Sequence, residues 1–146
     1  MRSYEATSLI SASPEQVWKV LSDTAAWPAW NSGVSKVDGN LALGQKLTIA
    51  VEANPGRAFP VKVTAIEEPS RMVFRGGMPL GLFTGQRTYT LAGAANGTTF
   101  TMREEYTGAL AGPIFKSIPD LGPSFQQFAD GLKQRAEQTE GSQSPE

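Results

Sequence analysis

One segment near the end of the chain, residues 120–138, has its apolar side chains on one face of a helix. Polar residues such as Asp130, Lys133 and Gln134 take the opposite face. The apolar positions are Leu121, Phe125, Phe128, Ala129, Leu132 and Ala136. A period of about 3.6 residues with a single apolar stripe predicts a long amphipathic helix that buries this stripe against other structure.

Most of the chain before this segment alternates between apolar and polar side chains, as half-buried β-strands do. In residues 45–52, for example, Leu47, Ile49 and Val51 share one face. Turn-forming residues separate the alternating runs. The predicted strands cover residues 4–11, 32–37, 45–52, 59–66, 72–75, 85–92 and 98–106.

Two short helices are expected after the first strand. Ser13 is a good N-cap, Pro14 suits the first helical position, and Gln16 completes a capping box. A second helical turn is expected around Trp27 and Trp30.

This order of elements predicts an α+β fold with two layers. A curved antiparallel sheet of six to seven strands holds the long C-terminal helix, and a space remains between sheet and helix. We expect one domain over residues 1–138, followed by a polar, disordered tail at residues 139–146.

The last two predicted strands form a hairpin, and its register follows from its loop. A loop at residues 94–97 sets the opposite pairs, which are Leu91 with Phe100, Tyr89 with Met102, and Arg87 with Glu104. The apolar members identify the inward face, so Arg87 and Glu104 are expected to face each other inside the sheet. We favour a structural role for this pair, in which the charges neutralise one another. The functional alternative is that the pair fixes a polar group of an otherwise apolar ligand.

Composition removes several classes of function. The chain of 146 residues has a net charge of −1 and no basic run, which argues against nucleic-acid binding. It contains no Cys and no His, so disulfides, thiolate or histidine catalysis and the usual transition-metal ligands are excluded. We therefore expect no metal and no cofactor. No apolar run has the length of a membrane span, and the first residues lack a signal-peptide core, so we expect a cytoplasmic protein without stable membrane insertion.

Several segments together resemble the START-like or SRPBCC superfamily, and within it the bacterial polyketide cyclase/dehydrase and lipid-transport family. The residues that carry the resemblance are Ser13, Pro14, Glu15, Gln16, Val17, Trp18, Trp27, Trp30 and the segments 68–74 and 125–132. The resemblance covers almost the whole chain and implies a helix-grip fold. Its motifs are structural, so they specify a fold better than a reaction.

The expected ligand site combines the inward residues with two unusually apolar loops, residues 77–83 and 108–118, which we expect to flank the cavity entrance. Ordinary packing is the alternative for these loops, and also for Tyr89 and Tyr106, for which we favour it. Trp18 is expected to seal the core. The candidate ligand-binding residues are Trp27, Trp30, Phe74, Leu82, Phe83, Arg87, Tyr89, Met102, Glu104, Tyr106, Phe115, Phe125 and Phe128.

We expect the protein to bind a small hydrophobic molecule, such as a lipid, a polyketide or an isoprenoid. The alternative is a cyclase or aromatase that holds a reactive chain in one conformation. In that case Glu104 is the candidate acid or base, helped by Tyr106 or Arg87. A weaker alternative, implied by a related co-chaperone-like family, is a protein-interaction module. The sequence assigns no catalytic residue and leaves the oligomeric state open.

Overall fold

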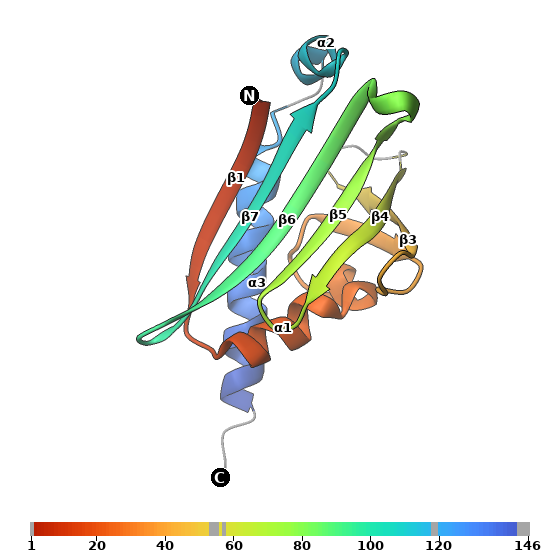
Figure 1. Ribbon diagram of the computed structural model, residues 1–146. Helices are drawn as coiled ribbons and strands as arrows, with labels where there is room; N and C mark the ends of the chain where they lie inside the picture. The colour runs from red at the N-terminus through yellow and green to blue at the C-terminus, as the bar shows by residue number, and fades with distance from the viewer. Residues whose placement is uncertain (1, 53–55, 57, 118–119, 143–146) are drawn as a thin grey trace.

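The fold is described from a computed structural model that covers residues 2–52, 56, 58–117 and 120–142, with the backbone alone for residues 139–142. Within these residues, seven strands form one antiparallel sheet in the order β1-β7-β6-β5-β4-β3-β2. The long helix α3 (Gly122–Ser142) runs along one side of the sheet, behind β1, β7 and β6 in Figure 1. The strands are β1 (Arg2–Ile10), β2 (Val34–Asp38), β3 (Lys46–Val51), β4 (Ala58–Glu67), β5 (Arg71–Met78), β6 (Phe83–Ala94) and β7 (Gly97–Thr107). This arrangement is the predicted helix-grip.

Helix α1 (Pro14–Ser22) begins where the capping residues predict. The Ser13 side chain accepts a hydrogen bond from the Gln16 backbone N–H at 3.1 Å. The helix η1 (Thr24–Ala29) follows, and the indole N–H of Trp27 donates to the Leu21 carbonyl at 3.0 Å. Because Trp27 is 1% exposed, this bond fixes a large ring in the core next to the sheet.

Helix α3 buries the predicted apolar stripe. Phe125, Phe128, Ala129, Leu132 and Ala136 are all buried, and Leu121 packs against the core from its edge. The Ser8 hydroxyl donates to the Ala129 carbonyl at 3.1 Å, which joins β1 to the helix. A Cβ at Gly131 would collide with the carbonyl oxygen of Asn31, so only glycine allows the chain after η1 to approach the helix this closely.

The β6–β7 hairpin has the predicted register. The cross-strand partners are Leu91 with Phe100, Tyr89 with Met102, and Arg87 with Glu104. The ladder continues to Ala94 and Gly97, so the turn itself is shorter than the predicted loop while the pairing is unchanged.

The structure differs from the sequence prediction around the two apolar loops. Strand β5 runs to Met78 and β6 begins at Phe83, so the predicted loop at residues 77–83 consists of two strand ends and the turn η2 (Pro79–Gly81). The strand predicted to end at Arg75 is longer, because Gly76 and Gly77 pair with β6 and extend the ladder. The second loop contains the short helix α2 (Ala111–Ser117).

Two further expectations concern the end of the chain. Helix α3 continues to Ser142, which is four residues into the segment expected to be a disordered tail. The helix therefore extends beyond Ala136, the last residue of its apolar stripe. Residues 143–146 of that tail, and Ile118 of the second apolar loop, lie outside the described residues.

Candidate functional site

An ion pair between neighbouring strands faces helix α3. The Nε of Arg87 on β6 donates to Oε1 of Glu104 on β7 at 2.8 Å, and Nη2 donates to the same oxygen. The two side chains are 25% and 16% exposed. The Arg87 guanidinium carbon lies 4.6 Å from the ring centroid of Phe125, the first buried aromatic residue of α3. The pair is therefore inside the grip, as the register predicts.

The charges of this pair depend on each other. Burial acts to lower the pKa of Arg87, but the Glu104 carboxylate opposes this effect and the net pKa lies above the ordinary value. The guanidinium therefore stays charged, and Glu104 is its counter-ion. Both hydrogen bonds use Oε1, and a Cβ added at Gly85 would meet Oε2 at 2.6 Å. Gly85 thus leaves room for the second carboxylate oxygen.

Two tyrosine side chains lie beside the pair with unsatisfied hydroxyls. Tyr89 is 0% exposed and Tyr106 is 6% exposed, and within the described part of the chain neither hydroxyl forms a hydrogen bond of ordinary geometry. Arg87 lies close enough to act on the Tyr89 hydroxyl, and Glu104 close enough to act on the Tyr106 hydroxyl. Burial raises the pKa of Tyr89, while Arg87 opposes the shift. Burial, followed by the Glu104 carboxylate, raises the pKa of Tyr106. Buried polar groups without partners are rare in proteins, so these hydroxyls can bond to a bound molecule or to water.

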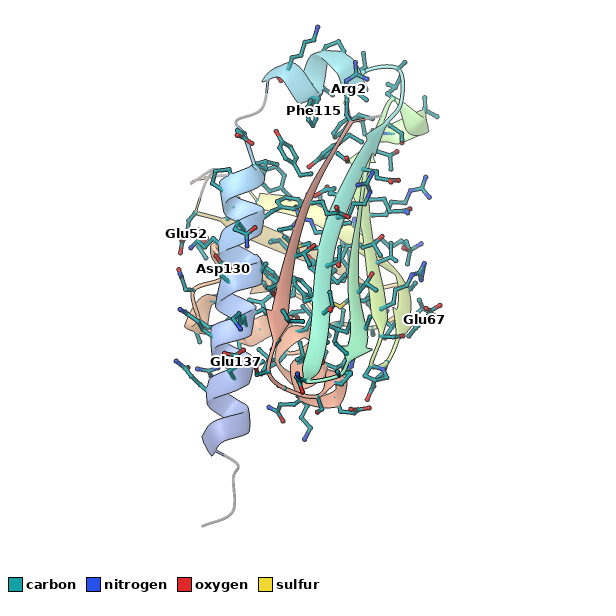
Figure 2. All side chains as sticks on the ribbon, turned by 90° about the vertical axis from the view of Figure 1, so that its left-hand side faces the viewer. Arg2, Glu52, Glu67, Phe115, Asp130 and Glu137 are labelled. Atoms are coloured by element: carbon teal, nitrogen blue, oxygen red, sulfur yellow. The ribbon has the colours of Figure 1, made fainter. Side chains whose placement is uncertain are left out.

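Aromatic rings surround the polar residues in two groups. The deep group lies between η1, the sheet and α3, with ring centroids 5.0–6.3 Å apart. It consists of Trp27, Phe74, Tyr89, Phe100 and Phe128. The upper group lies at the α2 end, where Figure 2 shows Phe115. It consists of Tyr4, Phe83, Tyr106, Phe115 and Phe125.

The structure brings most of the predicted site residues together. The buried members are Trp27, Phe74, Tyr89, Met102, Tyr106, Phe125 and Phe128, and the half-buried members are Trp30, Phe83, Arg87, Glu104 and Phe115. Trp30 packs on Phe128 with ring centroids 5.2 Å apart. Leu82 is set apart from the others, because it follows the turn η2 and is 40% exposed.

Two residues of the site were missing from the sequence prediction. Tyr4 stacks on Phe115 with ring centroids 5.2 Å apart, and it shares the inward face of β1 with Ala6, Ser8 and Ile10. The alternation of apolar and polar residues along β1 indicates that Tyr4 faces inward. Gly85 has no such signal, because its role depends on where the Glu104 carboxylate lies.

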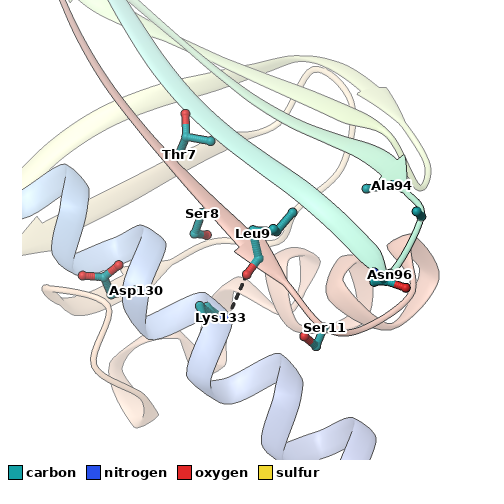
Figure 3. Close-up of a pocket in the computed structure, with 9 residues that line it drawn as sticks. Thr7, Ser8, Leu9, Ser11, Ala94, Asn96, Asp130 and Lys133 are labelled. Carbon is teal, nitrogen blue, oxygen red and sulfur yellow. Dashed lines mark hydrogen bonds between the residues drawn. The ribbon is translucent and has the colours of Figure 1, made fainter.

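Neither of two hollows on the described surface contains the inward pair. The larger, of about 590 Å³, lies between the end of β1, the β6–β7 turn and α3, where Lys133 donates to the Leu9 carbonyl at 2.8 Å (Figure 3). The smaller, of about 220 Å³, lies on the outer face of β4, β5 and β6. The expected space between sheet and helix is occupied by the two aromatic groups, because their rings pack against one another across it.

Two features of other kinds of site are absent from the described residues. No group of three or more Asp or Glu side chains there has the arrangement of a metal site. No helix among these residues is long and apolar enough to span a membrane.

Comparisons with known proteins agree with this fold. Residues 1–137 match the family described as "Polyketide cyclase / dehydrase and lipid transport". An uncharacterised protein from Mycobacterium tuberculosis is 27% identical over 131 residues, which is 85% of this chain and 78% of that protein.

Two solved structures show the same fold. A protein from Mesorhizobium loti has a TM-score of 0.73 and 19% identity, with 94% of this chain and 98% of that chain aligned. The di-domain ARO/CYC StfQ from the steffimycin biosynthetic pathway has a TM-score of 0.72 and 11% identity, with 95% of this chain and 52% of that chain aligned.

Proposed function

The chain belongs to the polyketide cyclase/dehydrase and lipid transport family, and from this premise we propose that it binds a small, mostly hydrophobic molecule between the sheet and α3. The observation that carries the proposal is the pair of buried, unpartnered hydroxyls of Tyr89 and Tyr106 beside the Arg87–Glu104 ion pair. Small-molecule sites are mostly apolar with a few polar groups that fix the ligand's orientation. A polar end of the ligand completes the hydrogen bonds of the two tyrosines, and its apolar part contacts the rings.

We expect binding to displace part of the upper aromatic group, since its Phe125 ring lies 4.6 Å from the Arg87 guanidinium carbon. Tyr4, Phe83 and Phe115 are only half-buried, so they can be displaced at lower cost than the deep group. The segment before α2 contacts the turn η2 through the Leu110 N–H, which donates to the Leu82 carbonyl at 2.8 Å. We therefore place the entrance between α2 and η2.

The proposal is tested with a matched pair of probes, 2-naphthol and 2-methylnaphthalene, which differ in one polar group. We expect the wild-type protein to bind 2-naphthol more tightly, by about fivefold to tenfold for one added hydrogen bond. Tyr106→Phe is expected to reduce this preference, since only the Tyr89 hydroxyl then remains, without lowering the free energy of unfolding, because the Tyr106 hydroxyl forms no hydrogen bond of ordinary geometry. Isothermal titration calorimetry and urea unfolding measure the two quantities.

Controls separate the polar contact from general damage. Tyr4→Phe, in the same aromatic group, is expected to keep the preference for 2-naphthol. Glu104→Gln is expected to weaken 2-naphthol binding while the protein remains folded. Equal affinity of the wild-type protein for both probes, or no binding of either, would contradict the proposal. Native mass spectrometry of protein purified from its own host then identifies a retained ligand.

A cyclase or aromatase function is the second candidate, and the carboxylate geometry favours it. Both donors from Arg87 use Oε1 of Glu104, so Oε2 is available as an acid or base. StfQ, which shares this fold, is a di-domain ARO/CYC from the steffimycin biosynthetic pathway. Under this proposal Glu104→Gln abolishes turnover of a poly-β-ketone analogue but leaves its binding measurable. Unchanged product distribution with and without the wild-type protein argues against catalysis.

A further inference from the structure

Three cations occupy neighbouring positions on the outer face of the sheet, and we call them the cationic row. Lys46 on β3 pairs with Lys62 on β4, and Lys62 pairs with Arg75 on β5. All three are exposed, and within the described residues none forms an ion pair with a carboxylate. Glu105, the next acid along this row of the sheet, is bound to Arg103 at 3.0 Å. Like charges at directly opposite positions destabilise a sheet, so the row points to an anionic partner.

The smaller hollow lies beside this row. Lys62, Arg75, Thr64 and Thr84 are among the residues that line its volume of about 220 Å³. A phosphate group suits this lining, because the two charged donors and the Thr84 hydroxyl can bind its oxygens, whereas the Thr64 hydroxyl already donates to the Val73 carbonyl at 3.3 Å.

An apolar tip adjoins the same hollow. The tip comprises Met78, Leu80 and Leu82, which are 42%, 96% and 40% exposed. Leu80 also has a φ of 61°, in the left-handed region that leucine rarely adopts. Figure 1 shows the turn η2 at the same end of the molecule as α2. Met78 belongs both to the tip and to the lining of the hollow, so the two features form one continuous surface.

We propose that this surface docks on an anionic membrane. The hollow takes the phosphate of a lipid headgroup, the cationic row lies over neighbouring headgroups, and the apolar tip enters the boundary with the acyl chains. Amphipathic surfaces that combine cations with exposed apolar side chains bind anionic bilayers in this way. A soluble phosphate compound accounts for the cations alone and leaves three exposed apolar side chains without a contact.

Docking goes beyond ligand binding and can be measured without any ligand. It does bear on the proposed function, because the tip is joined through the Leu82 carbonyl to the segment before α2. A membrane at this position faces the proposed entrance, from which a hydrophobic molecule can pass into the interior.

The test is co-flotation of the full chain with phosphatidylcholine vesicles, with and without phosphatidylglycerol. We expect binding to the anionic vesicles only, and its loss at high salt, where surface charges are screened. Lys62→Gln is expected to weaken binding about fivefold, and Lys62→Gln with Arg75→Gln about 25-fold. Leu80→Asn is expected to weaken it about tenfold, since asparagine keeps the left-handed backbone but loses the apolar side chain.

Matched controls use the same changes at the other end of the molecule. Lys19→Gln on α1 and Leu9→Asn on β1, both at exposed positions, are expected to leave vesicle binding unchanged. Lys62→Gln is also expected to keep or raise the urea midpoint, because it relieves repulsion within the row.

Several outcomes would overturn the docking proposal while leaving ligand binding intact. They are equal binding to neutral vesicles, no vesicle binding by the wild-type protein, and equal losses in the control variants. Calorimetry with inorganic pyrophosphate is run in parallel. Tight pyrophosphate binding without vesicle binding shows instead a site for a soluble anion. Failure of the 2-naphthol experiment leaves the docking proposal standing, since the two assays share neither probe nor variant.

Discussion

A buried tyrosine without a hydrogen-bond partner resists ionisation, because the interior solvates a phenolate poorly. Burial raises the pKa of both Tyr89 and Tyr106. In the unfolded chain these groups lose their protons near pH ~10, whereas the folded protein keeps them. Above that pH the unfolded state binds fewer protons, so the free energy of unfolding falls as the pH rises. We predict a lower urea midpoint at a pH of about 11 than at about 9.

Variants isolate the tyrosine contribution to this pH dependence, since lysines titrate in the same range. The double variant Tyr89→Phe and Tyr106→Phe is expected to lose less stability between the two pH values than the wild type. Phenolate absorbance near 295 nm reports the ionisation directly. Ionisation of all three tyrosines of the folded wild type near pH ~10 would contradict the prediction.

A substitution at Gly85 tests whether the stability of the protein depends on the position of the Glu104 carboxylate. A Cβ at this glycine would meet Oε2 of Glu104 at 2.6 Å, while the next contact, with Tyr106, is at an ordinary 3.5 Å. We predict that Gly85→Ala destabilises the protein by about 1 kcal/mol, because the carboxylate must shift while Arg87 holds it. Urea unfolding measures the change.

Gly93 is the matched control in the same strand, since a Cβ there meets nothing closer than Pro14 at 3.8 Å. Gly93→Ala is expected to be neutral or to stabilise by about 0.4–1 kcal/mol. The penalty at Gly85 should also vanish in a Glu104→Ala background, as a double-mutant cycle would show. A penalty that persists there means that the carboxylate is not its cause.

At the scale of residues, the sequence predicts which residues face each other across two strands. It predicts less well which atoms of their side chains form hydrogen bonds. Alternation and the hairpin loop are sufficient to place Arg87 opposite Glu104, because a slip by one residue would expose Phe100 and Tyr89. They do not show that both Arg87 donors use one carboxylate oxygen. Such details depend on side-chain rotamers and on residues of other strands. The alternation within one strand carries no information about either.

Among the elements, α3 contributes most of the contacts that close the grip. Phe128 is 3% exposed and packs against rings from η1, β6 and β7, including Trp27 at a centroid distance of 5.0 Å. We predict that Phe128→Ala destabilises the protein by about 3–5 kcal/mol, as large-to-small changes in cores do. Chemical denaturation followed by circular dichroism measures this value.

Gln126, which is exposed on the same helix, provides the comparison. Gln126→Ala removes a hydrogen bond to Asp130 on the surface and is expected to change stability by less than about 0.5 kcal/mol. Similar losses in the two variants would mean that α3 does not dock through its apolar stripe.

The elements themselves follow from local signals, whereas some of their ends depend on neighbouring elements. The stripe of α3 and the cap of α1 are visible in the sequence because one helix face or one turn determines them. Strand β5 extends past Gly76 and Gly77 because its neighbour β6 supplies partners there. A glycine pair indicates a turn when it is considered alone, so only the assembled sheet shows that the ladder continues.

For the molecule as a whole, the predicted grip is present but its interior is occupied by side chains. Sheet and helix meet through the deep aromatic group, while the upper group closes the α2 end. Sequence patterns determine which residues face inward, whereas the remaining free volume depends on how their rings pack. A ligand therefore has to displace part of the upper group. The energetic cost of that displacement lowers the affinity that the contacts alone would provide.

This requirement predicts where binding changes the dynamics of the protein. With 2-naphthol at about a hundred times its dissociation constant, mass action raises the free energy of unfolding by about 2.7 kcal/mol. For a chain of this size the melting temperature then rises by about 5–10 °C. Beyond this global effect, we expect local protection from hydrogen exchange in α2 and in the turn η2. The C-terminal half of α3, which lies away from the proposed entrance, is expected to gain no additional protection.

Hydrogen exchange with mass spectrometry separates the global stabilisation from the local protection. Amides that exchange only through global unfolding are all slowed by the same factor, whereas amides that exchange through local opening are slowed only where the ligand stabilises the structure. Tyr106→Phe serves as the control, since its weaker 2-naphthol binding should reduce both effects together. Unchanged exchange in α2 and η2 under saturating probe, alongside a raised melting temperature, would place the ligand elsewhere. The hollow between β1 and α3 is then the site to examine, because Lys133 and Asp130 line it at a distance from the inward ion pair. Protection of α2 and η2 instead supports a ligand that enters beneath α2 and reaches Arg87 and Glu104.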